Sequence, residues 1–167
     1  MTRIVPGKES VTDYGRRLLA LWGPVAGWFA IVLIMSGDRF SGKETGRWLA
    51  VVLHSFFPDL DPASIGHINL LLRKMAHLFE YGVLGALSYR ALWGGHPQWS
   101  RARGLAAGLA LAIVCAGVDE GRQTYVPSRV GSPWDVLVDT VGAGIGLTAS
   151  SVRRWVRDRS VASLPRP

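Results

Sequence analysis

Several features that the sequence lacks narrow the class of protein. It has one cysteine, Cys115, which excludes an internal disulfide; because it lies in an apolar run, we expect it to be a small buried side chain. Its basic residues are not interleaved with aromatic residues as in proteins that bind single strands, so we expect no nucleic acid partner despite a formal net charge of +7. It also has no internal repeat and no low-complexity tract, which favours a single domain.

Apolar residues, by contrast, are abundant and come in long runs. They make up 49% of the 167 residues, whereas charged residues make up 19%. Four runs, residues 18–36, 75–93, 104–118 and 134–152, approach the length of about 20 residues that crosses a bilayer. No Ala-x-Ala site follows the first run, which is therefore expected to be a spanning helix and not a cleavable signal peptide. We predict an all-α fold, an integral membrane bundle of four transmembrane helices.

The segment between the first two runs is long and has a helical pattern of its own. Residues 46–57 are apolar but too short to span a bilayer, and their bulky side chains recur at helical spacing. We predict a short interfacial or re-entrant helix here that ends at Pro58, and a second short helix from Pro62 into the second span. The predicted domains are an N-terminal arm (1–17), a four-helix membrane domain (18–152) and a basic, disordered tail (153–167).

Lysine and arginine are unevenly distributed around the four runs. Twelve of the 19 lie before the first run, from the end of the second run to the start of the third, or after the fourth, and seven lie in the other segments. Cytoplasmic segments are enriched in these residues. We therefore expect a multi-pass protein of the plasma membrane with both termini in the cytoplasm.

Ionisable residues gather at the ends of three predicted spans that share one side of the membrane. Such residues inside a spanning helix are costly, so they mark a functional site by default. The second span contributes Lys74, His77, Glu80 and Tyr81, the third contributes Asp119, Glu120, Arg122 and Gln123, and the fourth contributes Asp135 and Asp139, with Arg129 just before it. We predict that these side chains line one cavity near the outer face.

Helical spacing refines this prediction. His77 and Glu80, three residues apart, share one face of their helix. Asp135 and Asp139 share a face that continues into two glycines, a small-xxx-small pattern that permits close helix contact. These carboxylates are therefore expected to face the bundle. The glycines permit contact within one chain or between chains, so the oligomeric state stays open.

Each of these residues also has a structural interpretation. Lys74 can reach the headgroups as a snorkelling side chain, and Asp135 suits the first turn of a helix, where an acid complements the dipole. His77 and Glu80 fit a hydrogen-bonded pair, and the carboxylates near Arg122 fit an ion network. His77-x-x-Glu80 lacks the second histidine of zinc-binding helices, so the spacing assigns no metal and leaves the cofactor open.

Three motifs in order resemble the signatures of the VanZ family. They are Arg73-Lys74-x-x-His77-x-x-Glu80-Tyr81, then Asp119-Glu120-x-Arg122-Gln123 with Pro127-x-Arg129, then Ser132-x-x-Asp135-Val136 with Asp139-x-x-Gly142. The resemblance covers residues 36–147 and implies a membrane protein of four or five helices. The family is named for a protein associated with teicoplanin resistance, and a role in resistance does not follow from membership. By analogy the family has been placed near enzymes that exchange lipid headgroups.

One residue departs from the family pattern. Arg122 stands where relatives usually have histidine, and an arginine cannot act as a base at neutral pH. It can instead bind an anion such as phosphate.

The first functional hypothesis is an enzyme that acts on a lipid-linked phosphate or headgroup in the outer leaflet, with His77 as base or nucleophile. The catalytic candidates are His77, Glu80, Asp119, Glu120 and Asp139, and the substrate-binding candidates are Lys74, Tyr81, Arg122, Gln123, Arg129 and Asp135. The partner would be a membrane lipid or a lipid-linked envelope precursor. The alternatives are binding or shielding of a cell-wall precursor or glycopeptide antibiotic without chemistry, and a proton-coupled transporter, against which the missing repeat argues.

Overall fold

The protein is helical throughout the part of the chain that the computed structural model describes, residues 10–126 and 131–162. The elements are α1 (Val11–Met35), the 3-10 helix η1 (Asp38–Phe40), α2 (Gly42–Phe56), α3 (Pro62–Gly95), α4 (Arg101–Gln123) and α5 (Pro133–Ala162). The predicted all-α class is therefore confirmed.

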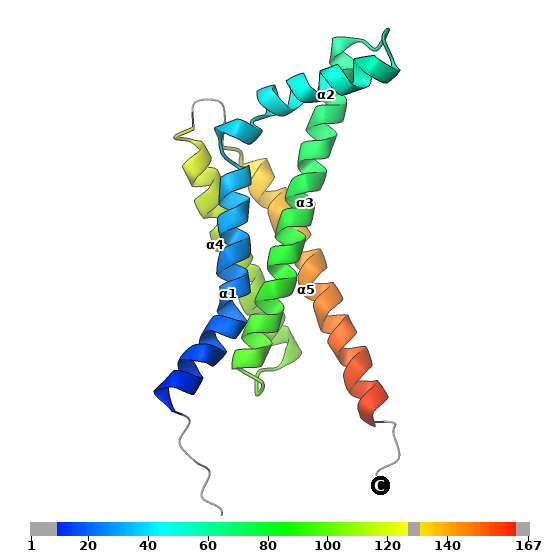
Figure 1. The fold of residues 1–167 in the computed structure, drawn as a ribbon. Helices are drawn as coiled ribbons and strands as arrows, with labels where there is room; N and C mark the ends of the chain where they lie inside the picture. Colours follow the sequence, from blue (N-terminus) through cyan, green and yellow to red (C-terminus); the bar gives the residue numbers. More distant parts are fainter. Residues whose placement is uncertain (1–9, 127–130, 163–167) are drawn as a thin grey trace, which may run out of the picture.

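Four long helices form a bundle, and the shorter α2 lies across one end of it (Figure 1). We call the end that carries α2 the upper end, as it is drawn. There α1 and α4 end and α3 and α5 begin, while α1 begins and α5 ends at the lower end (Figure 1). Helix α3 occupies the centre, because it packs against α1, α2, α4 and α5. The predicted interfacial segment is indeed a separate helix, and the helix expected from Pro62 is continuous with the second long helix.

Local capping explains where four helices begin. The side chains of Ser10, Ser41, Asp61 and Ser100 each accept a hydrogen bond from the backbone N–H three residues later. At α3, Asp61 also accepts from the Ser64 hydroxyl at 2.6 Å, and this bond holds the pKa of Asp61 below its usual range. Pro62 follows at the first helical position, where its missing N–H costs nothing.

Helices α3 and α5 cross at backbone contact, which only small residues permit. A Cβ atom at Gly142 would lie 2.5 Å from the carbonyl oxygen of Leu78, and one at Gly146 would collide with the backbone of Gly82. A Cβ at Gly85 would lie 2.9 Å from the Cα of Ala143. The predicted glycine face of the fourth span is therefore used within one chain.

Three helices extend further than the sequence analysis expected. Helix α1 already begins at Val11, inside the predicted arm, and α4 continues to Gln123 because its terminal carboxylates are buried in the bundle. Helix α5 runs to Ala162, so residues 153–162 are helical and not part of a disordered tail. Contacts one turn apart accompany this extension, with Arg154 and Asp158 paired at 3.6 Å and the Arg159 guanidinium over the Trp155 ring.

Two of the described helices, α1 and α4, are long and apolar enough to cross a membrane. Helices α3 and α5 are longer but carry ionisable side chains, so the count of four spans stays a prediction. Large apolar side chains are nevertheless exposed on every long helix: Ile31, Phe79, Val114 and Ile145 are between 44% and 66% exposed. Apolar surface on this scale requires a lipid or protein environment.

The glycine crossing leads to a first prediction. Gly146→Ala places a methyl group against the backbone of α3, and overpacking of this kind costs about 1–3 kcal/mol. Thermal unfolding of the detergent-solubilised protein should therefore show a lower melting temperature. Gly144→Ala is the matched control, because a Cβ at Gly144 meets nothing within 4 Å. Equal melting of the two variants would contradict the close crossing.

Candidate functional site

Buried polar side chains collect near the upper end of the bundle. We define the polar cluster as His77 and Glu80 of α3, Asp119, Glu120 and Gln123 of α4, and Asp139 of α5; none is more than 8% exposed. Ser36, which follows the last residue of α1, is buried beside them. The expected convergence of three helices is therefore present, while the catalytic roles of these residues stay predictions.

His77 and Asp139 connect α3 to α5. The Nδ1 atom of His77 lies 2.9 Å from Oδ1 of Asp139, whose side chain is fully buried. An ionised carboxylate can only accept, so Nδ1 donates in this pair and Nε2 is left with its lone pair. The second carboxylate oxygen of Asp139, Oδ2, is buried and has no hydrogen-bond partner among the described residues.

Asp119 connects α4 to α1. Its carboxylate accepts from the Ser36 hydroxyl at 2.5 Å and from the Gln123 amide at 3.1 Å. The Arg122 guanidinium lies 3.6 Å from the same carboxylate and also donates to Ser36 and, at 2.5 Å, to the Leu33 carbonyl oxygen. Arg122 thus holds two helices together, which matches the ion network considered as its structural alternative.

Glu120 connects α4 to the segment before α5. Its Oε2 accepts from the backbone N–H of Ser132 at 2.7 Å, and its Oε1 accepts from the Gln123 amide at 3.3 Å. Glu80 is fixed differently, because the Trp28 indole of α1 donates to its backbone carbonyl at 2.8 Å. Each carboxylate-bearing position is therefore held by a second helix or loop.

The remaining predicted residues lie around the polar cluster. The Lys74 ammonium pairs with the Asp135 carboxylate, which joins α3 to the first turn of α5. The Tyr81 ring is fully buried, and its hydroxyl has no partner among the described residues. Arg129 falls outside the described residues.

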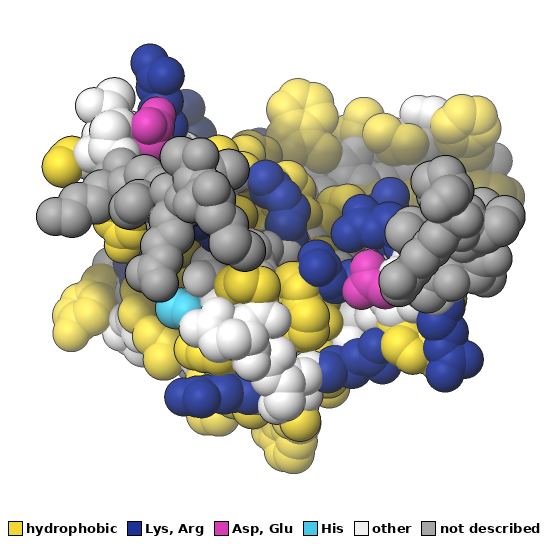
Figure 2. Space-filling view, turned by 90° about the horizontal axis from the view of Figure 1, so that it is seen from below, with side chains coloured by type: hydrophobic (Ala, Val, Ile, Leu, Met, Phe, Trp, Pro, Cys, Tyr) yellow, Lys and Arg dark blue, Asp and Glu magenta, His cyan; other side chains and the backbone are white. Residues whose placement is uncertain are grey.

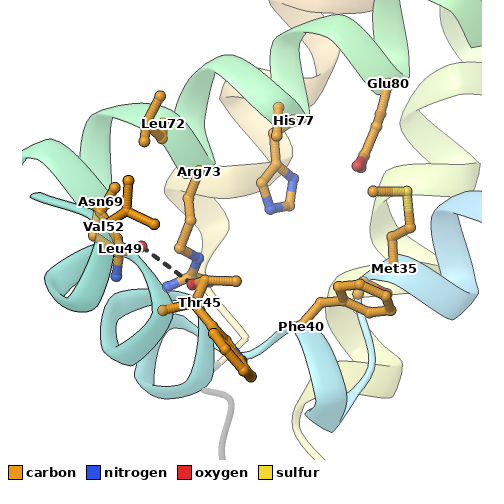
Figure 3. Close-up of a pocket in the computed structure, with 13 residues that line it drawn as sticks. Met35, Phe40, Thr45, Leu49, Val52, Asn69, Leu72, Arg73, His77 and Glu80 are labelled. Carbon is orange, nitrogen blue, oxygen red and sulfur yellow. Dashed lines mark hydrogen bonds between the residues drawn. The ribbon is translucent and has the colours of Figure 1, made fainter. Parts of the chain in front are cut away.

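A pocket of about 450 Å³ lies between α2, α3 and the end of α1. Its walls are mainly apolar, formed by Met35, Phe40, Trp48, Leu49, Val52, Leu72 and Ala76. Its polar lining comprises Ser36, Thr45, Asn69, Arg73, His77 and Glu80. In Figure 3 the side chains of His77 and Glu80 project from α3 into the space that Phe40 and Met35 border. His77 therefore belongs to both the pocket and the polar cluster.

Four polar residues of the pocket lining were not among the candidates predicted from the sequence: Ser36, Thr45, Asn69 and Arg73. Arg73 stands beside Lys74 in the first motif and lines the pocket, so its position next to a candidate was a usable signal. Ser36 ends the first predicted span at the depth where the other polar residues lie. A search for polar residues on all four spans at that depth would have found it.

One subset of the polar cluster has the composition of a metal site. His77, Glu120 and Asp139 each offer a ligand atom, and these atoms all lie within 4.8 Å of one another. Because adjacent residues on a helix point about 100° apart, Glu120 faces His77 and Asp139 whereas Asp119 faces α1.

The Arg122 network gives a second prediction. Arg122→Ala removes the cation from Asp119, which is fully buried, so the free energy of unfolding should fall by about 1–3 kcal/mol. Arg47→Ala is the control, because its pair with Glu44 is 72% and 40% exposed and should contribute less than about 1 kcal/mol. Unfolding in mixed micelles measures both. Equal losses would show that Arg122 does not stabilise the contact of α1 with α4.

Comparison with protein families gives a match to VanZ/LLP1 over residues 21–154. No curated protein and no solved structure matches the chain. The matched range contains the whole polar cluster, all residues of the pocket and the whole of α4, and it begins within α1. It also covers well over half of the 167 residues. The chain belongs to the VanZ/LLP1 family.

Proposed function

We propose that this membrane protein acts on a lipid-linked phosphate or headgroup, with the apolar chain in the pocket and the polar group at His77. One observation carries the proposal: the pocket has apolar walls and ends at His77 and Glu80, with Arg73 also in its lining. Ligand sites typically combine such walls with a few polar groups that fix orientation. An amphiphile has the matching two-part chemistry.

The position of the pocket suits a ligand that comes from a bilayer. It is bordered by α2, which lies across the upper end of the bundle (Figure 1) and exposes Trp48 and Val52. Trp at such a position is typical of the membrane interface, where a lipid headgroup and the start of its chain meet. A lipid could therefore enter from the side, without leaving the membrane.

His77 is suited to proton transfer at this place. Its pair with Asp139 leaves Nε2 as the base, as in sites where a carboxylate orients an imidazole. In the reaction that we propose, Nε2 takes the proton of a water or hydroxyl whose oxygen bonds to phosphorus. The proton then goes to the leaving oxygen as the older P–O bond breaks. Arg73 supplies positive charge for the phosphate oxygens.

A second candidate is binding or shielding without chemistry. It is favoured by the contacts of Asp119, Glu120 and Arg122, which are used to hold helices together. A transporter is less well supported, because no Asp, Glu, His, Lys or Arg is buried in the described lower half, where the buried polar groups are on Ser88, Tyr89 and Ser151. A path for protons would need ionisable groups there.

We further propose that α3 and α5 also cross the membrane, which gives four spans with both termini in the cytoplasm. Arginine side chains gather at the lower end, which Figure 2 shows from below. Several lie over tryptophan rings: Arg101 over Trp155, Arg103 over Trp99 and Arg154 over Trp93. Arginine with interfacial tryptophan is the pattern of a cytoplasmic membrane face.

Topology can be tested by cysteine labelling in intact cells. In a Cys115→Ala background, a cysteine at Asp59, in the loop at the upper end, should react with a membrane-impermeant maleimide. A cysteine at Ala102, at the start of α4, should react only after the cells are opened. Both positions are exposed in the protein, so burial does not explain a failure to react. Labelling of position 102 in intact cells would reject the proposed orientation.

The activity can be tested by lipid mass spectrometry of membranes from cells that make the wild type or a variant. A lipid species altered by the wild type should return to its level in cells without the protein when His77→Ala removes the base. Leu49→Trp, which fills the pocket wall, should have the same effect.

Val51→Trp is the matched control for the pocket, because Val51 is on the same helix but is 65% exposed and does not line the pocket. This variant should keep wild-type activity. If the wild type alters no lipid while it is inserted and stable, the protein is not this enzyme. A lipid that copurifies unchanged with wild type and Val51→Trp, but not with Leu49→Trp, would then support binding without chemistry.

A further inference from the structure

We propose that His77, Glu120 and Asp139 bind a divalent transition-metal ion such as Zn²⁺ or Mn²⁺. The three residues come from three helices, α3, α4 and α5, and converge inside the bundle. Their ligand atoms lie within 4.8 Å of one another, and the side chains are buried, at 7%, 5% and 0% exposure of the residues. The sequence predicted them in one cavity but assigned them no metal.

The second oxygen of Asp139 is an independent observation that points to a ligand. Oδ2 is buried and accepts no hydrogen bond from the described residues. A buried carboxylate oxygen without a donor loses its hydration without compensation, so native structures rarely leave one in this state. A metal ion beside Asp139 would satisfy this oxygen.

The unbalanced negative charge of the site also favours a bound cation. Asp119 has Arg122 as its counter-ion, and Asp135 has Lys74. Glu120 and Asp139 have no lysine or arginine partner within the described ranges; their partners there are His77, Gln123 and the Ser132 N–H. Two buried carboxylates on facing helices repel each other, and a divalent ion would neutralise both.

The ligand set selects the kind of ion. One imidazole nitrogen and two carboxylate oxygens suit Zn²⁺, Mn²⁺ or Fe²⁺, whereas Mg²⁺ and Ca²⁺ prefer oxygen alone. Ligands of a tetrahedral zinc site lie about 3.3 Å apart, since each bond is about 2.0–2.1 Å long. His77 Nδ1 and Asp139 Oδ1, at 2.9 Å, are already near this separation, and an ion between them would replace the proton of their hydrogen bond. The ligand atom of Glu120, which lies within 4.8 Å of the other two, would have to approach further.

Other contacts would orient the ligands as in known metal sites. Gln123 and the Ser132 N–H hold the carboxylate of Glu120, one donor to each oxygen. Three protein ligands leave at least one coordination position open, as in catalytic sites. Because His77 also lines the pocket, that position could take an oxygen of a bound phosphate; this last step rests on the proposed function. In the ion-bound protein Nε2 would carry the imidazole proton, so the ion, and not His77, would activate the attacking oxygen.

The ion can be tested on the full-length protein in detergent, after treatment with a chelator and dialysis. Co²⁺ is titrated first, because a site of this kind gives visible absorption bands. Zn²⁺, Mn²⁺ and Mg²⁺ are then compared by elemental analysis of the dialysed protein. We expect about one Zn²⁺ or Mn²⁺ per chain, and at least tenfold weaker binding in Asp139→Asn and in Glu120→Gln.

Asp135→Asn is the matched control, because Asp135 is one turn from Asp139 on α5 and pairs with Lys74. It should bind the ion as the wild type does. A wild type that binds none of these ions at micromolar free concentration would overturn the inference, as would unchanged binding in both Asp139→Asn and Glu120→Gln. If one of these two variants fails to fold, ion binding by the other variant and the Co²⁺ titration of the wild type test the inference.

The same preparations separate this inference from the proposed function. Lipid conversion by a protein shown to bind no ion would overturn the metal site and leave the lipid activity standing. Stoichiometric ion binding that depends on Asp139 and Glu120, together with no altered lipid, would support the site and overturn the proposed enzyme.

Discussion

The close crossing of α3 over α5 is the constraint on which the polar cluster depends. The two backbones meet at Gly82 and Gly146, and His77 and Asp139 lie one to two turns above that point. A wider crossing would separate the imidazole from the carboxylate and leave Asp139 buried without a donor. The glycines and the buried pair therefore stabilise the same arrangement, one by packing and the other by hydrogen bonding.

Much of this arrangement could be predicted from the sequence, because helical periodicity is a local property. The spacing of Asp139, Gly142 and Gly146 predicted one buried face, and the structure uses that face against α3. His77 and Glu80 were likewise expected on the inward side of their helix, where both are buried. The three motifs predicted the family, and a match over most of the chain confirmed it.

What the sequence did not reveal depends on distances between helices. Arg122 can bind either a ligand or another helix, and the position of the end of α1 decides between the two. In the structure its partners are Leu33 and Ser36, at the end of α1. The choice of Glu120 over Asp119 as the neighbour of His77 depends on the rotation of α4. The full length of α5 was missed because the basic segment was expected to be disordered, whereas Arg154 contacts Trp93 of α3 and Trp155 contacts Arg101 of α4. Arg154 also pairs with Asp158 one turn along α5.

The location of the polar cluster at one end of the bundle has an energetic consequence. Moving a charge through the whole membrane potential is worth about 2.3 kcal/mol per 100 mV, and a charge that moves only a small part of the way gains a small part of that. An anionic headgroup or a metal ion that enters from the near face would cross little of the field. Its occupancy should therefore be the same in an energised cell and in a depolarised one, so the membrane potential would neither favour nor oppose binding.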